Sequence, residues 1–114
     1  MDINDITYIN DALNAIEKIR GYLKETTYDE FLKDEMKKDA VVYQVAIIGE
    51  AAGHISRAVR SSVEEVPWRK IIMTRNFLIH DYGKIDEELI WKTCKEDLKP
   101  LKTQLKELLD KGES

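Results

Sequence analysis

Apolar residues recur along this chain with a period close to 3.6 residues, which is the period of an amphipathic α-helix. The pattern predicts helices over residues 6–23, 28–32, 35–60, 67–81 and 86–112, separated by short connections. Short connections favour antiparallel neighbours. The expected fold is therefore all-α, an up-and-down bundle of four to five helices.

Residues near the expected helix ends have the chemistry of caps and breaks. Asn4 or Asp5 can cap the first helix, and Thr27 with Glu30 has the spacing of a capping box. Pro100 lies inside the last apolar stripe. That helix is therefore expected either to kink at Pro100 or to stop and restart with Pro100 in its first turn.

The third predicted helix is apolar around most of its circumference over residues 41–48. Such a helix is either central in its bundle or uses a second face against a partner. Gly49, Ala51, Ala52 and Gly53 follow directly and offer a smooth surface that another backbone can approach closely.

Length and composition predict one globular domain over residues 1–114, since a chain of this size is too small for two cores. Five Gly and two Pro are too few for the turns of an all-β sandwich. The longest apolar stretch, residues 41–55, is interrupted by polar residues and is too short to cross a bilayer. No secretory signal is recognisable and Cys94 is the single cysteine, so a reducing cytoplasm is the expected location.

The charge of the chain is unevenly distributed. The total is −4, but residues 53–84 carry +3 and include both histidines, which leaves −7 on the remainder. This asymmetry suits a focused anionic substrate better than a protein that coats nucleic acid along its length. An excess of solvated arginines would explain the count equally well.

The segment from Arg75 to Tyr82 combines a cation, a carboxamide, an imidazole and a phenol near the expected end of a helix. Metal-free RNA cleavage proceeds by attack of the 2′-hydroxyl on phosphorus and needs a base, an acid and cations near the developing charge. Arg75 can hold a phosphate, and His80 can transfer a proton near neutral pH. Because acid and base are two roles, a two-fold dimer that brings two copies of His80 together is predicted.

A purely structural role for these residues stays open at this point. His80 can compensate the dipole of a helix end, and Arg75 can pair with any of 22 acidic residues. On an ideal helix Asn76 and His80 share a face, whereas Arg75 lies about 100° from Asn76 and about 140° from His80. Spacing alone therefore does not place Arg75 beside His80.

Other polar residues offer weaker candidates. Glu50 and His54 are four positions apart and can bind a metal together, but the lack of a third ligand favours an ordinary hydrogen bond. Glu50 can also line the active groove, and Asp81 can orient His80 or only hydrate the helix end. The large aromatic residues and the cysteine are expected in the core rather than against nucleic-acid bases: Trp68, Trp91, Phe77 and Cys94.

Over essentially its whole length the chain resembles the HepT family of HEPN-domain ribonuclease toxins. The resemblance rests on Arg75-Asn76-x-x-x-His80-x-Tyr82, supported by Ile48-Gly49-Glu50-Ala51, Pro67-Trp68, Trp91 and Asp97-Leu98-x-Pro100-Leu101. It implies a HEPN-like bundle that forms homodimers, with the active groove at the interface. It also implies that Arg75 and His80 are the ribonuclease residues and that Asn76 supports them.

The same resemblance implies a regulatory partner. Toxins of this family are neutralised by a small MNT-type nucleotidyltransferase that adds AMP to the motif tyrosine, which here matches Tyr82. A bulky anion two residues from His80 would fill the groove and repel RNA phosphates.

The sequence thus predicts a homodimeric, metal-independent endoribonuclease without a cofactor, which acts on RNA rather than DNA. It would be the toxin of a two-gene toxin–antitoxin system, with Arg75, His80 and Asn76 as its catalytic residues. Two alternatives remain: a non-catalytic helical partner that regulates a nucleotidyltransferase, and a helical dimer whose motif is structural. Detection of RNA cleavage separates the first hypothesis from both.

Overall fold

The computed structural model describes residues 1–80 and 86–112, apart from the side chains of residues 77–80. The described part of the chain is helical and contains no β-strand, which confirms the all-α prediction. In chain order the elements are α1 (Ile3–Leu23), α2 (Tyr28–Lys33), α3 (Glu35–His54), α4 (Arg57–Ser61), α5 (Trp68–His80), α6 (Glu87–Lys92), the π-helical turn η2 (Thr93–Asp97) and α7 (Leu98–Gly112).

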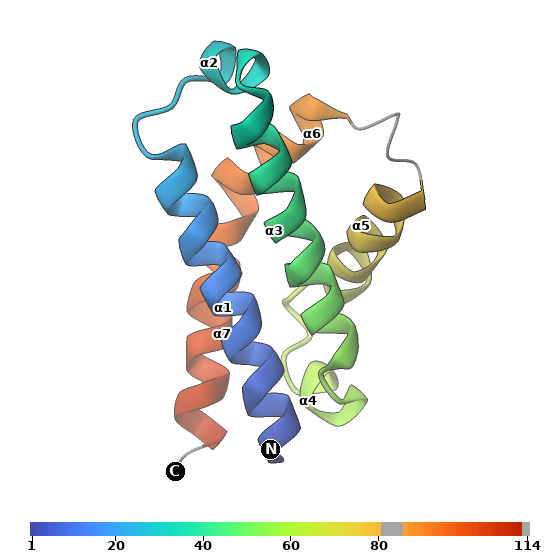
Figure 1. The fold of residues 1–114 in the computed structure, drawn as a ribbon. Helices are drawn as coiled ribbons and strands as arrows, with labels where there is room; N and C mark the ends of the chain where they lie inside the picture. Colours follow the sequence, from blue (N-terminus) through green and yellow to red (C-terminus); the bar gives the residue numbers. More distant parts are fainter. Residues whose placement is uncertain (81–85, 113–114) are drawn as a thin grey trace.

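Four long helical segments run alternately up and down (Figure 1). α1 leads away from the N-terminus, α3 returns, α5 leads away again, and the continuous run of α6, η2 and α7 returns to the C-terminus. The chain ends therefore lie at the same end of the bundle (Figure 1). None of the helices in the described part of the chain is long and apolar enough to span a membrane.

The apolar circumference of α3 is explained by its central position, because α3 packs against both α1 and α5. Val41, Val45 and Ile48 of α3 are buried in the main core. Tyr43 is the exception on this segment, with 63% of its surface exposed. Most of the apolar surface of residues 41–48 is thus covered by the chain itself, and its composition no longer argues for a partner.

The long third helix predicted over residues 35–60 is wrong at its end. α3 stops at His54, Ile55 is extended and buried, and the short helix α4 starts afresh. The Ser56 side chain caps α4 by accepting from Val59 N, while the Asp5 carboxylate accepts from both Ser56 N, at 2.7 Å, and Ser56 Oγ, at 3.0 Å. A tertiary contact from α1 therefore ends the helix.

The caps follow the sequence only in part. Thr27 and Glu30 form the expected capping box, but α1 is capped by Asp2, whose side chain accepts from Asp5 N, rather than by Asn4 or Asp5. At Pro100 the helix does not stop and restart: α6 continues without a break through the π-helical turn η2 into α7, and Pro100 lies in the first turn of α7. A π turn is a usual way for a helical run to absorb a missing backbone donor.

α3 and α5 approach each other closely at Gly49. A Cβ atom at this position would lie 2.5 Å from Arg75 Cβ and 2.9 Å from the carbonyl oxygen of Ile71. Glycine is therefore required here by space rather than by backbone angle. The expected smooth surface on α3 is confirmed, and it brings Arg75 directly against α3.

Candidate functional site

Arg75 lies half-buried between α5 and α3, where the close contact at Gly49 fixes its backbone. Its Nε atom is 2.8 Å from Glu50 Oε2, the residue that follows Gly49. The contact has the distance of an ion pair but not the direction of a hydrogen bond, since Nε–H finds no acceptor in line. Glu50 therefore holds the guanidinium mainly by charge, and about a third of the Arg75 side chain stays exposed to solvent.

Glu50 uses its other oxygen for His54. The distance from Glu50 Oε1 to His54 Nε2 is 3.0 Å, and the His54 ring stacks on Tyr8 of α1 with centroids 4.8 Å apart. The hydrogen bond from His54 and, second, the charge of Arg75 hold the pKa of the Glu50 carboxyl below its ordinary value. The carboxylate is thus ionised at neutral pH and braced from two sides.

Asn76 completes the arrangement on α5. Its side-chain oxygen accepts a hydrogen bond of 2.9 Å from Arg75 Nη1, although the two residues leave the helix about 100° apart. The long arginine side chain bridges this angle. Glu50, Arg75 and Asn76 therefore form one connected cluster, which presents a held guanidinium at the surface where it can receive a phosphate.

The remaining motif residues can be placed only along the backbone. α5 includes His80, which puts Arg75, Asn76 and His80 on one helix. The side chain of His80 lies outside the described part of the structure, as do Asp81 and Tyr82. The expectations for His80, Asp81 and Tyr82 therefore stay predictions.

The weaker candidates resolve towards structural roles. Glu50 and His54 form the hydrogen bond favoured from sequence, and among the described residues no cluster of three or more His, Cys, Asp or Glu could hold a metal. Trp68 is buried, and its Nε1 donates to Val63 O at 3.0 Å. Trp91 packs on Phe31 with ring centroids 5.3 Å apart.

Cys94 is half-buried, and burial raises the pKa of its thiol to about 12. The thiolate, which is the reactive form, is therefore scarce at neutral pH. This agrees with the expectation that Cys94 is unreactive. Phe77, which was also expected in the core, has its side chain outside the described part.

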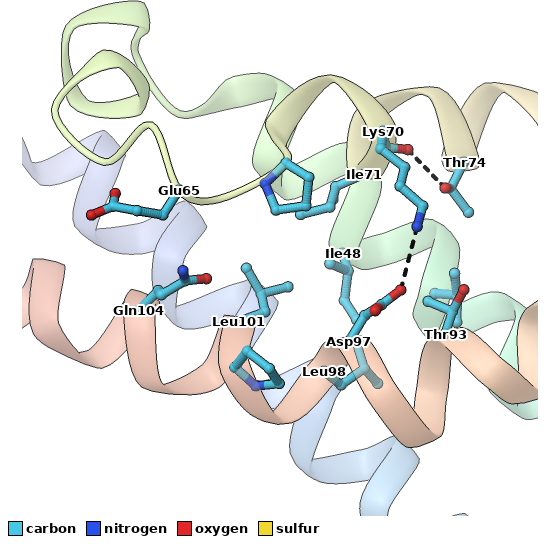
Figure 2. Close-up of a pocket in the computed structure, with 13 residues that line it drawn as sticks. Ile48, Glu65, Lys70, Ile71, Thr74, Thr93, Asp97, Leu98, Leu101 and Gln104 are labelled. Carbon is cyan, nitrogen blue, oxygen red and sulfur yellow. Dashed lines mark hydrogen bonds and ion pairs between the residues drawn. The ribbon is translucent and has the colours of Figure 1, made fainter.

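An apolar cavity of about 220 Å³ lies between α3, α5 and the η2–α7 segment (Figure 2). Ile48, Ile71 and Leu101 line it, and Lys70 Nζ lies 3.6 Å from Asp97 Oδ2 beside it (Figure 2). The cavity includes neither Glu50 nor Arg75. Its lining is mostly apolar and contains no described side chain of the Arg75–Tyr82 motif, and Lys70 and Asp97 pair with each other. The cluster around Arg75 is therefore the better candidate site.

Sequence reasoning did not foresee that Glu50 is the partner of Arg75. The partner depends on the register of α3 against α5, which the close contact at Gly49 sets. The available signals were the i,i+4 spacing of Glu50 and His54 and the small residues beside Glu50. Tyr8 carried no signal, because its contact with His54 joins two helices far apart in the sequence.

Comparison with known proteins adds an independent observation. The sequence model of a family described as "Ribonuclease HepT-like" matches residues 12–108, which include Glu50, Arg75 and His80. The chain is 37% identical to a protein of Thermococcus cleftensis named "Probable ribonuclease HepT", over 89% of this chain and 92% of that protein.

Two further relatives show the same agreement in length. A protein of Methanocaldococcus jannaschii named "Putative RNase MJ1380" is 35% identical over 86% of this chain and 90% of its own length. One from Caldanaerobacter subterraneus, named "Putative RNase TTE0752", is 32% identical over 91% of this chain and 93% of its own length. No solved structure matches the chain.

Proposed function

This chain belongs to the HepT-like ribonuclease family, and from that premise we propose that it is a metal-independent endoribonuclease in which Arg75, Asn76 and His80 carry the chemistry. The observation that carries the proposal is the cluster of Glu50, Arg75 and Asn76. It holds the Arg75 guanidinium in place on α5, the helix that also carries Asn76 and His80, so little reorganisation is needed when a phosphate binds.

In the proposed reaction the 2′-hydroxyl of one nucleotide attacks the adjacent phosphorus. A base removes the 2′-hydroxyl proton, and an acid protonates the departing 5′-oxygen, which leaves a 2′,3′-cyclic phosphate and a free 5′-hydroxyl. Arg75 binds the non-bridging oxygens as their charge grows. His80 supplies one proton-transfer group per chain.

A homodimer would supply the second imidazole. Met73 and Asn76 are exposed on α5, and positions 73, 76 and 80 follow one another at helical spacing on one face. Met73 and Leu89 line an apolar hollow between α5 and α6, with 55% and 48% of their surfaces exposed. Pairing of two copies through this face would bury these side chains and bring both motif helices together.

Replacement of catalytic residues tests the proposal. Arg75→Ala and His80→Ala should each abolish cleavage of RNA by the purified protein, while the free energy of unfolding stays within about 1 kcal/mol of the original value. Cleavage is measured on labelled RNA in the presence of excess chelator, and unfolding is measured with urea. Undiminished cleavage by His80→Ala would refute the proton-transfer role, and unfolding of that variant would make His80 structural.

We further propose that the protein is the toxin of a two-gene system and that Tyr82 is its regulatory residue. The ordinary pKa of a tyrosine, near 10, makes Tyr82 a poor proton shuttle beside a histidine, and AMP on its phenol would place an anion near the groove. Tyr82→Phe should therefore retain ribonuclease activity but escape neutralisation by an MNT-type nucleotidyltransferase with ATP. Mass spectrometry of the co-expressed pair should place AMP on the peptide that contains Tyr82.

Two results would contradict the Tyr82 proposal. AMP addition that persists in Tyr82→Phe would put the acceptor elsewhere. Neutralisation without any change in mass would mean that the nucleotidyltransferase blocks the active groove at the dimer interface simply by binding. This is the result expected if the chain is a non-catalytic helical binding partner.

A further inference from the structure

A concentrated basic surface lies at the edge of the bundle where α1 and α7 pack together. It is a groove of about 490 Å³, lined by six cationic side chains and one carboxylate, Glu25. The cations are Arg20, Lys24, Lys95, Lys99, Lys102 and Lys106. They give the lining a charge of +5 in a chain whose total is −4.

The cations form two rows that face each other across the groove. Arg20 of α1 and Lys24, the residue directly after α1, are four residues apart, and the lysines of η2 and α7 recur at intervals of four, three and four residues. Ile19, Leu23 and Leu98, all buried, line the groove between the rows. Like charges at such spacing repel one another and lower helix stability, so packing does not explain the arrangement.

Few of these cations are neutralised within the chain. Glu17 pairs with Arg20 at 3.3 Å and also with Lys102, and Lys95 Nζ lies 4.7 Å from the centre of the Trp91 ring. Among the described residues Lys24, Lys99 and Lys106 have no ion-pair partner. The uncompensated positive charge of the groove therefore lies mainly on the η2–α7 side, with Lys24 as the unpaired cation opposite.

We propose that this groove binds the phosphate backbone of RNA, away from the site of cleavage; this rests on the proposed ribonuclease function. The row of lysines along η2 and α7 matches a chain of phosphates and carries no base-reading geometry. None of the exposed large apolar side chains in the described part lines the groove, which disfavours a membrane surface. Glu50 and Arg75 lie at the α3–α5 edge, so an RNA held in the groove would span the bundle to reach them.

Binding of a labelled single-stranded RNA to the cleavage-deficient His80→Ala protein tests the proposal. In that background, Lys99→Glu with Lys106→Glu should weaken RNA binding about tenfold or more at low salt. The slope of log affinity against log salt should shrink by about 1.4, because two phosphate contacts are lost. The matched control is Lys33→Glu with Arg57→Glu, which changes the total charge equally at exposed positions outside the groove and should change affinity far less.

The milder pair Lys99→Ala with Lys106→Ala should reduce affinity in the same direction, and it replaces the charge reversals if these impair folding. Equal losses in the groove and control variants would overturn the proposal, as would binding of anionic vesicles, but not RNA, through Lys99 and Lys106. Failure of the original protein to cleave any RNA would refute the proposed function separately. Loss of RNA binding on reversal of the groove charges would still support the groove as an RNA site.

Discussion

At the scale of single residues, Glu50 governs how Arg75 is presented. Its two oxygens contact Arg75 and His54, so removal of its charge frees the guanidinium. Glu50→Gln should therefore lower kcat/KM for RNA about tenfold or more, because small displacements of a phosphate-binding group are costly. The urea midpoint of unfolding should change little, as is usual when an exposed ion pair is removed.

A double-mutant comparison distinguishes positioning from general structural support. If Glu50 acts through Arg75, Glu50→Gln should have no further effect on cleavage in an Arg75→Ala background. A full additional loss in the double variant would contradict this role.

The lowered pKa of the Glu50 carboxyl adds a pH criterion. Because the pKa of Glu50 is lower in the folded protein than in the unfolded chain, its ionised carboxylate stabilises the fold at pH values above the ordinary pKa of a carboxyl group. This stabilisation is lost as the pH falls through the pKa of Glu50 in the folded protein. The ratio of kcat/KM for RNA between the unsubstituted protein and Glu50→Gln should therefore stay constant from about pH 6 to about pH 8, where the Glu50 carboxylate is fully charged. A ratio that varies across this range would mean that Glu50 itself exchanges a proton during the reaction.

At the scale of helices, the packing of α5 on α3 depends on Gly49. Gly49→Ala would place a methyl group against the backbone of Ile71 and the Cβ of Arg75, neither of which can rotate away. We expect a loss of about 1 to 3 kcal/mol in the free energy of unfolding, measured with urea. Gly53→Ala is the matched control: its added Cβ would meet nothing closer than 3.9 Å, so stability should hold or rise.

Helix periodicity predicted the existence of the main helices, and the capping box at Thr27 was visible in the sequence. The end of α3 was not, because it is set by Asp5, which is 51 residues away from Ser56 in the chain. The same contact explains why Asp5 does not cap its own helix. Local signals thus located the helices, whereas long-range hydrogen bonds fixed their ends.

At the scale of the whole molecule, the proposed chemistry depends most on the dimer that we propose. The original protein should sediment as a dimer at micromolar concentration. Met73→Glu should shift it to monomer and reduce cleavage, because a charge in an apolar interface is costly. Ile3→Glu alters another exposed apolar residue on α1 and should leave the dimer intact. A monomeric and fully active original protein would contradict the two-histidine arrangement.

The apolar residues 41–48 left open whether the third predicted helix is central or packs against a partner, and in the structure α1 and α5 cover most of that surface. Periodicity cannot distinguish burial within a chain from burial between chains, since both remove the same side chains from water. The sequence pattern also could not predict the basic groove between α1 and α7. Its two rows come from segments about 75 residues apart, which only the packing of α1 on α7 unites.

The tight contact at Gly49 has a consequence for mutational screening. If expression of the active protein stops cell growth, as we propose, the cells that survive its expression should carry substitutions at Gly49 as often as at Arg75, because any side chain at Gly49 pushes the arginine out of register. Residues ranked by how often they are substituted in these survivors would therefore place Gly49 among the essential ones, although it has no side chain that takes part in the reaction. Thermal melting of the recovered variants would separate the two groups, since Gly49 substitutions lower the melting temperature and Arg75 substitutions should not.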